Sequence, residues 1–184
     1  MGCNLSGGGD DGNDDDDRKI LFLGLDNAGK TSLLYKLKDD EFNPQVPTVG
    51  LNVEQIKYRN MQLTLWDVGG QARKLWRHYY DKVDGLIFVV DSTDTDRMPM
   101  AKSEIEKIMS EDGLAKVPML ILANKQDLES AQTEKEISDN LALHTITRKD
   151  VVYHGCSART GDGIWESVAR LADLMDLVGK KADS

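Results

Sequence analysis

The chain has 184 residues, of which 40% are hydrophobic and 30% are charged, a composition typical of one globular domain with a sizeable core. No apolar run approaches the roughly 18 residues that a membrane-spanning helix needs, and the acidic N-terminus lacks the apolar segment of a secretory signal peptide. Cys3 and Cys156 are the only cysteines, so we expect no disulfide framework and a reducing compartment.

Negative charge is concentrated at the N-terminus. The net charge is −9, and residues 1–17 carry no Lys or Arg but contain six aspartates, Asp10, Asp11, Asp14, Asp15, Asp16 and Asp17. The rest of the chain is therefore only mildly acidic, and nothing in it suggests a nucleic-acid surface. With Leu5 as its only large aliphatic residue, the segment cannot bury enough apolar surface to offset the entropy of ordering. We expect residues 1–17 to be disordered and residues 18–184 to form one domain.

Downstream of residue 18, strand-like and helix-like patterns alternate. Apolar runs at residues 20–23, 86–90, 119–122 and 151–153 are typical of buried parallel strands. Residues 51–58 and 61–65 have the pattern of an antiparallel hairpin. Apolar residues at helical spacing mark residues 32–38, 101–109, 137–141 and 164–178, and residues 133–136 have capping-box spacing. This alternation predicts an α/β sheet with helices on both faces, which binds ligands at the carboxyl ends of its strands.

The segment between the first strand and the first helix follows the phosphate-loop pattern, in which two glycines separated by four residues precede Lys and Ser or Thr. Its residues are Gly24, Leu25, Asp26, Asn27, Ala28, Gly29, Lys30 and Thr31, followed by Ser32. A strand, a glycine turn and a helix N-terminus aim backbone N–H groups at one point, which makes an anion site. There Lys30 can reach the β- and γ-phosphates, and the Thr31 hydroxyl can ligate Mg²⁺. The alternative is an ordinary glycine turn.

Two further loops carry groups that suit a nucleoside triphosphate. At the end of the second hairpin strand, Asp67 can hold Mg²⁺ through water. The Gly70 N–H can approach a γ-phosphate, and Gln71 can orient a water for in-line attack. Thr48, in the loop before the first hairpin strand, offers a hydroxyl as a second Mg²⁺ ligand. Taken alone, these residues also fit a strand-end turn and a loop threonine.

The ends of the last two apolar runs offer groups for a base. Asp127 can accept hydrogen bonds from N1–H and N2–H₂ of guanine, a donor pair that adenine lacks. Asn124 would brace this loop, and the Lys125 stem would cover one face of the ring. Next to Ser157, the Ala158 N–H can meet the guanine O6. Taken alone, this second group of residues fits a helix N-cap and an uninformative turn.

These motifs follow one another in order, each at a strand end, and the ordered set resembles the small GTPases of the Arf/Arf-like family over roughly residues 18–178. The resemblance is carried by residues 24–31, 47–54, 66–71, 75–80 and 124–127, with Asp26 where Ras-like relatives usually carry glycine. It implies a phosphate-loop small-GTPase fold, a six-stranded and mostly parallel sheet with about five helices. GTP or GDP with Mg²⁺ would be bound. The implied activity is slow GTP hydrolysis that resets a molecular switch, with Gln71 as the catalytic residue.

The same resemblance implies three kinds of partner. An exchange factor would load GTP, an activating protein would speed hydrolysis, and effectors would bind residues 48–53, the hairpin and residues 71–80. Leu51, Trp66 and Tyr79 match the apolar effector patch of the family, with Leu51 in place of the more usual Phe. We expect Trp66 and Trp76 to pack around these segments rather than to stack on a ligand. The histidines, His78, His144 and His154, have no metal-ligand spacing.

The segment after Gln71 departs from the family pattern. Between Gln71 and Leu75 the chain has only Ala72, Arg73 and Lys74, two residues fewer than the resemblance leads us to expect. Three helical residues span less than one turn, so sliding cannot preserve the helix face. This shortening keeps open a second interpretation, a non-catalytic GTP-binding scaffold. A third, an ATP-using enzyme, is disfavoured by Asp127.

The N-terminus departs from the family as well. Arf proteins usually carry an amphipathic N-terminal helix, which residues 1–17 cannot form. Instead, Gly2 fits the N-myristoylation pattern and Cys3 is a candidate palmitoylation site. One myristoyl chain binds membranes only marginally, and anionic lipid would repel the aspartates, so stable anchoring needs Cys3. We expect a cytoplasmic protein on the cytoplasmic face of Golgi, endosomal or plasma membranes that acts in vesicle trafficking; an unmodified tail is the alternative.

Overall fold

The computed structural model describes residues 16–39, 51–59, 61–81 and 83–182. Its strands are β1 (Asp16–Gly24), β2 (Leu51–Tyr58), β3 (Met61–Val68), β4 (Gly85–Asp91), β5 (Met119–Asn124) and β6 (Val151–Gly155). Its α-helices are α1 (Lys30–Asp39), α2 (Met98–Met109), α3 (Glu134–Asn140) and α4 (Ile164–Ala182). Short 3-10 helices are η1 (Gly70–Tyr79), η2 (Thr95–Arg97), η3 (Asp112–Leu114) and η4 (Leu143–Thr145).

The strands form one six-stranded sheet in the order β2-β3-β1-β4-β5-β6. β2 and β3 pair antiparallel, with Leu51 opposite Val68 and Tyr58 opposite Met61, and the other neighbouring strands pair parallel. The predicted α/β class, the hairpin and the parallel strands are therefore confirmed. Because β1, β3, β4, β5 and β6 run the same way, their carboxyl ends meet at one edge of the sheet.

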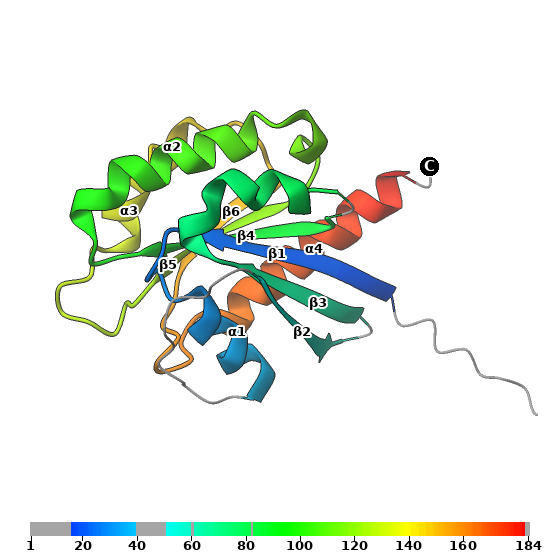
Figure 1. Ribbon diagram of the computed structural model, residues 1–184, viewed down its shortest axis with the longest axis horizontal. Coiled ribbons are helices and arrows are strands. Elements are labelled where there is room, and N and C mark those ends of the chain that lie inside the picture. The colour runs from blue at the N-terminus through cyan, green and yellow to red at the C-terminus, as the bar shows by residue number, and fades with distance from the viewer. Residues whose placement is uncertain (1–15, 40–50, 60, 82, 183–184) are drawn as a thin grey trace, which may run out of the picture.

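Helices cover both faces of the sheet, as the alternating patterns predict (Figure 1). Successive side chains of a strand point to opposite faces. Ile20 and Phe22 of β1 accordingly belong to one buried cluster, which they share with α1 and α4, whereas Leu21 and Leu23 belong to the other, which they share with α2 and α3. Burial on both faces explains why the central strands are continuous apolar runs.

Helix number and element ends differ from expectation. The resemblance implies about five helices, whereas the described residues contain four α-helices, and the segment after β3 is the 3-10 helix η1. The first strand is longer than the apolar run at residues 20–23, because its pairing with β3 continues back to Asp16. There the Asp17 carboxylate accepts a hydrogen bond from the Thr64 hydroxyl at 2.9 Å. Asp16 and Asp17 thus belong to the sheet and not to the segment 1–17 that was expected to be disordered. β6 lies at the sheet edge and is only partly buried.

The helix ends follow local signals in the sequence. Thr133 caps α3, where its hydroxyl accepts from the Glu136 N–H and the Glu136 carboxylate accepts from the Thr133 N–H at 2.8 Å. On α4, Ile164, Val168 and Leu171 are buried as their spacing predicts. None of the helices in the described part of the chain is both long and apolar enough to span a membrane.

Candidate functional site

The phosphate loop joins β1 to α1 at the carboxyl edge of the sheet, and close packing requires both of its glycines. A Cβ at Gly24, whose φ is +142°, would lie 2.3 Å from the Val89 carbonyl oxygen of β4. A Cβ at Gly29, whose φ is +95°, would lie 2.3 Å from Nδ2 of Asn124. Only glycine fits at both positions, because each combines a left-handed backbone with a contact shorter than a carbon atom permits. The loop is thereby pressed against β4 and β5.

Lys30 lies at the start of α1 with its ammonium folded under the loop. Nζ donates to the carbonyl oxygens of Gly24 at 3.0 Å and Leu25 at 2.9 Å, and the residue is buried. Burial lowers the pKa of Lys30 to about 8, against the attraction of Asp67 and Asp26, which raises it. A buried cation aimed at the loop is suited to a polyanionic ligand, whose charge would offset the lost solvation.

Thr31 and Asp67, predicted to serve one metal ion, are brought together from α1 and β3. The Thr31 hydroxyl donates to Oδ2 of Asp67, which is fully buried at the end of β3. A hydroxyl and a carboxylate are the oxygen donors that Mg²⁺ prefers, so this pair fits the ion that the family resemblance implies. Ser32 follows on α1 and is half-buried.

Other predicted residues of this region are described only in part. Gly70 is the first residue of η1 and follows the end of β3 directly through Gly69. Gln71 is the second residue of η1, and its side chain lies outside the described part of the structure. Thr48, Gly2 and Cys3 also lie outside the described residues. Their predicted roles therefore stay predictions.

Asn124 joins the phosphate loop to the loop after β6. It ends β5 and is almost completely buried. Its Nδ2 donates to the Ala28 carbonyl at 2.9 Å, and its Oδ1 accepts from the Ala158 N–H at 3.0 Å. The predicted bracing role thus has a definite geometry, in which one amide ties together loops 130 residues apart in sequence. The Ala158 N–H, assigned from the sequence to guanine O6, donates here to Asn124.

Asp127 lies two residues beyond Lys125 and faces the loop after β6. Its Oδ1 accepts from the Ser157 hydroxyl at 2.7 Å. The Lys125 ammonium lies 2.5 Å from Oδ2 of Asp91 at the end of β4, and its backbone has a φ of +68°. A left-handed backbone is uncommon for a lysine and persists only where neighbours hold it. Asp91 and Ser157 thus orient the two side chains that the sequence assigns to a base.

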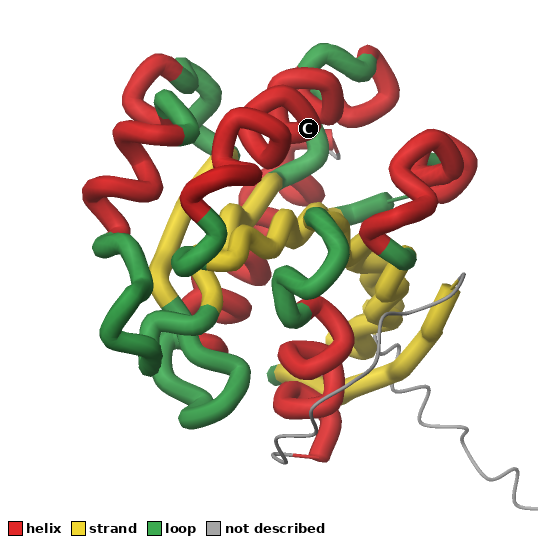
Figure 2. Tube along the Cα trace, turned by 60° about the vertical axis from the view of Figure 1, so that its left-hand side comes forward, coloured by secondary structure: helices red, strands yellow, loops and turns green. Residues whose placement is uncertain are grey.

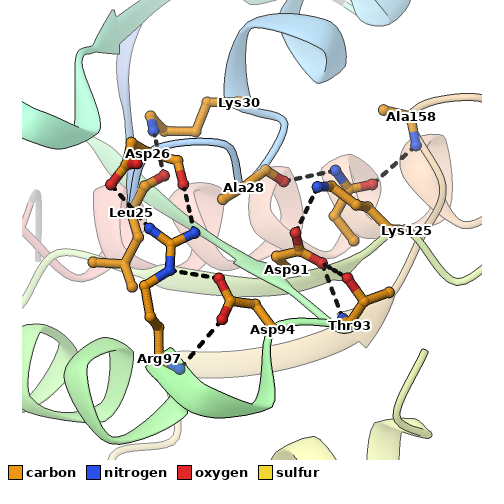
Figure 3. A network of polar contacts seen from close by, with 11 residues as sticks. Leu25, Asp26, Ala28, Lys30, Asp91, Thr93, Asp94, Arg97, Lys125 and Ala158 are labelled. Atoms are coloured by element: carbon orange, nitrogen blue, oxygen red, sulfur yellow. Dashed lines mark hydrogen bonds and ion pairs between the residues drawn. The ribbon is translucent and has the colours of Figure 1, made fainter. Parts of the chain in front are cut away.

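Arg97 is part of this site but was not found by motif reasoning. It lies at the start of α2, where Nη1 donates to Oδ1 of Asp26 at 3.0 Å and Nη2 donates to the Asp26 carbonyl at 3.1 Å (Figure 3). Its Nε lies 2.5 Å from Oδ2 of Asp94. The available signal was topological. β4 neighbours β1, so the residues that follow β4 lie beside the loop that follows β1.

The side chains of Trp66 and Trp76 pack against neighbouring aromatic rings, as expected. Trp66 meets Tyr79 edge-on with ring centroids 6.1 Å apart, and Trp76 meets Phe88 edge-on at 6.2 Å. Leu51 on β2 is exposed and lies opposite Val68, two residues along β3 from Trp66. Among the described residues no group of three or more His, Cys, Asp or Glu side chains could hold a metal ion.

The arrangement of loops at the carboxyl edge is visible when the molecule is turned (Figure 2). The class of phosphate-loop nucleotide-binding proteins is defined by a mostly parallel sheet with a phosphate loop after its first strand, an oxygen pair suited to a divalent ion and a carboxylate on a neighbouring loop.

Comparisons with known proteins place the chain within this class. Residues 11–175 match the model of the ADP-ribosylation factor family, Arf. The fold is similar to a solved structure of the Arl6 BBS3 small GTPase from Trypanosoma brucei with a bound nucleotide analogue, GppNp. The two share 33% sequence identity with a TM-score of 0.79, over 87% of this chain and 98% of that one. The chain belongs to the ADP-ribosylation factor family.

Proposed function

We propose that the protein is a guanine-nucleotide switch that binds GTP and GDP and hydrolyses GTP slowly. The observation that carries this proposal is the Asn124 amide, which holds the Ala28 carbonyl and the Ala158 N–H at 2.9 and 3.0 Å. One side chain thereby sets the distance between the phosphate loop and the loops beside Asp127. A ligand with phosphates at one end and a base at the other suits this arrangement.

The chemistry of each end favours a guanine nucleotide. At the phosphate end, the Lys30 ammonium and the loop N–H groups meet anionic oxygens, and Thr31 and Asp67 would hold the Mg²⁺ that neutralises them. At the base end, the second oxygen of the Asp127 carboxylate can accept from N1–H or N2–H₂ of guanine while Oδ1 keeps the Ser157 hydroxyl. Adenine offers no such donors. The family relative in complex with GppNp supports the same choice.

Base selectivity is tested by competition. GDP should displace a fluorescent guanine nucleotide from the purified protein at concentrations at least about 100-fold lower than ADP, because a site left with an unpaired carboxylate rejects the wrong base strongly. Asp127→Asn should reduce this preference, and Asp139→Asn, on α3, serves as a matched surface control. Equal displacement by ADP would argue against a guanine site.

Hydrolysis is assigned to a water oriented by Gln71 and held in line with the γ-phosphate, which the Gly70 N–H stabilises. Positioning is incomplete in the isolated protein, and an arginine supplied by an activating protein typically adds about 10³–10⁵ in rate. Gln71→Leu should therefore remain loaded with GTP when a family activating protein is added. Unchanged stimulated turnover in this variant would refute the assigned role.

A non-catalytic GTP-binding scaffold is the second candidate, favoured by the length and the conformation of the segment after Gln71. The segment after Gln71 is short, and residues 70–79 form a 3-10 helix, which is tighter than an α-helix. Single-turnover hydrolysis with and without an activating protein separates the candidates. A switch releases phosphate faster with the activating protein, whereas a scaffold retains GTP in both reactions.

Membrane attachment through the N-terminus completes the proposal. Myristoylation at Gly2 and palmitoylation at Cys3 would together anchor the switch on cytoplasmic membrane faces, where effectors binding the Leu51, Trp66 and Tyr79 surface act in vesicle traffic. Two acyl chains bind stably where one is marginal. Gly2→Ala protein should stay in the soluble fraction, and Cys3→Ser protein should bind membranes reversibly. A Gly2→Ala variant that still pellets with membranes would count against the anchor, and intact mass spectrometry of native protein reports both lipids.

A further inference from the structure

Arg97 makes an unusual set of contacts for a residue outside the nucleotide-binding motifs. Its guanidinium contacts both the carboxylate and the backbone carbonyl of Asp26, at 3.0 and 3.1 Å, so it grips one residue of the phosphate loop at two points. The fork is oriented from behind by Asp94, which accepts from both Nε at 2.5 Å and the Arg97 N–H at 3.3 Å. The neighbouring Met98 and Ala101 of α2 are buried, so the backbone from which the Arg97 side chain extends is held by packing.

Asp26 places a carboxylate in a loop that the proposed function fills with phosphates, and like charges at close range repel. Arg97 offsets this carboxylate from the opposite side of the loop to Lys30, as Figure 3 shows. The three residues Asp26, Arg97 and Asp94 therefore form a supporting network behind the anion site, in which the arginine is a partner of the loop rather than of the nucleotide.

The contact between Arg97 and the Asp26 carbonyl also bears on the orientation of the peptide between Asp26 and Asn27. In a trans peptide the carbonyl oxygen and the following N–H point in opposite directions. Because Arg97 holds the Asp26 carbonyl on its own side, the Asn27 N–H points away from Arg97. Asn27 has a φ of +63°, and a flip of this peptide would carry φ toward the negative values that side-chain-bearing residues prefer. The contact from Nη2 of Arg97 to the Asp26 carbonyl stabilises the observed orientation against this flip.

We propose that Arg97 is a positioning residue for phosphate binding, which keeps the peptide between Asp26 and Asn27 turned so that the Asn27 N–H serves the nucleotide phosphates. This inference rests on the proposed guanine-nucleotide binding. An arginine suits this role better than a lysine, because the planar guanidinium presents its donors in a fixed fork, whereas a lysine ammonium is a point charge on a flexible stem.

The test uses the full-length protein loaded with fluorescent mant-GDP and measures its release after excess GDP is added. Arg97→Gln should release the nucleotide about 10-fold faster or more, the size expected for loss of a charge-assisted hydrogen bond. Arg97→Lys, which keeps the charge and most of the stem, should also release faster and guards against misfolding of the first variant. Arg148→Gln is the matched control. Arg148 likewise donates to a carboxylate, of Asp150, and to two backbone carbonyls, but it does so beside β6 away from the site.

Two readouts separate positioning from charge and from general stability. If Arg97 only neutralises Asp26, then Asp26→Asn combined with Arg97→Gln should release GDP no faster than Asp26→Asn alone; positioning requires that the double variant stay faster. The ³¹P resonance of the β-phosphate of bound GDP should move in Arg97→Gln and remain in place in Arg148→Gln.

Release from Arg97→Gln at the rate of Arg148→Gln, or full rescue by Asp26→Asn, would overturn the positioning role while leaving nucleotide binding intact. Wild-type protein that does not retain GDP would overturn the proposed function and this inference together. Faster release with a moved ³¹P resonance and no rescue supports the role.

Discussion

Replacing Asn124 by alanine should remove a side chain that connects the phosphate loop to the loop after β6. The side chain is 1% exposed, and its removal would leave the Ala28 carbonyl and the Ala158 N–H without their partner. Each buried polar group left unpaired costs about 1–3 kcal/mol, so the expected loss in the free energy of unfolding is about 2–6 kcal/mol. We expect about 3 kcal/mol, because water entering the vacated space would satisfy part of the loss.

Urea unfolding of the nucleotide-free protein, followed by circular dichroism, measures this loss without the added stabilisation that a bound nucleotide provides. Asn140→Ala is the matched control, since Asn140 is an exposed asparagine with a single side-chain hydrogen bond to Gln132 at 3.1 Å. It should change stability by no more than about 0.5 kcal/mol. Amide exchange of Ala158 should become faster in Asn124→Ala. Equal stability of the two variants, with unchanged protection of the Ala158 amide, would refute the bracing argument.

Three further predictions concern the loop, its lysine and an aromatic contact. Gly29→Ala should destabilise the protein by about 2 kcal/mol or more, because φ at this position is +95° and the added Cβ would overlap the Asn124 amide. The control Gly113→Ala should be nearly neutral, because nothing lies within 4 Å of its Cβ, and equal melting temperatures of the two variants would contradict the prediction. Burial lowers the pKa of Lys30 from 10.5 to about 8, so between these pH values the unfolded chain binds more protons than the folded protein. The free energy of unfolding should therefore rise with pH across this window by about 1–3 kcal/mol relative to Lys30→Met. Urea unfolding between pH 7.5 and 10 measures the effect, and parallel pH profiles of the two proteins would exclude it. A double-mutant cycle of Tyr58→Ala and Trp165→Ala should give a coupling of about 0.5–1.5 kcal/mol, because the rings stack at 5.7 Å and 14°, and strictly additive losses would show that the stack contributes nothing.

Much of the fold follows from local patterns. The apolar runs at residues 86–90 and 119–122 correctly predicted the fully buried strands β4 and β5. A strand covered on both faces needs apolar side chains at every position, which makes it recognisable in the sequence. The Thr133 and Glu136 box capped its helix, since capping uses only groups within one turn. The length of β1 was missed. Its first residues, Asp16 and Asp17, pair with β3, a partner 45 residues away that no local pattern reveals.

The sequence predicted which residues belong to the candidate site better than it predicted the contacts between them. The sequence singled out five residues because each carries a group suited to a nucleotide and lies at a strand end or in the segment that follows one: Lys30, Thr31, Asp67, Asn124 and Asp127. Arg97 could not, because an arginine at a helix start has no signature in sequence. Its role depends on β4 lying beside β1, which brings it within 3.1 Å of the Asp26 carbonyl.

The sequence by itself predicted the chemistry of the candidate site: a loop suited to phosphates, oxygens suited to a divalent ion and a carboxylate suited to a base. Each could be predicted because it depends on residue type and short spacing. Only the tertiary structure decided which of these groups support one another. Asn124 reaches 96 residues back to Ala28, and Arg97 reaches 71 residues back to Asp26. Such contacts arise from strand order and side-chain packing, which are properties of the whole sheet and not of any segment.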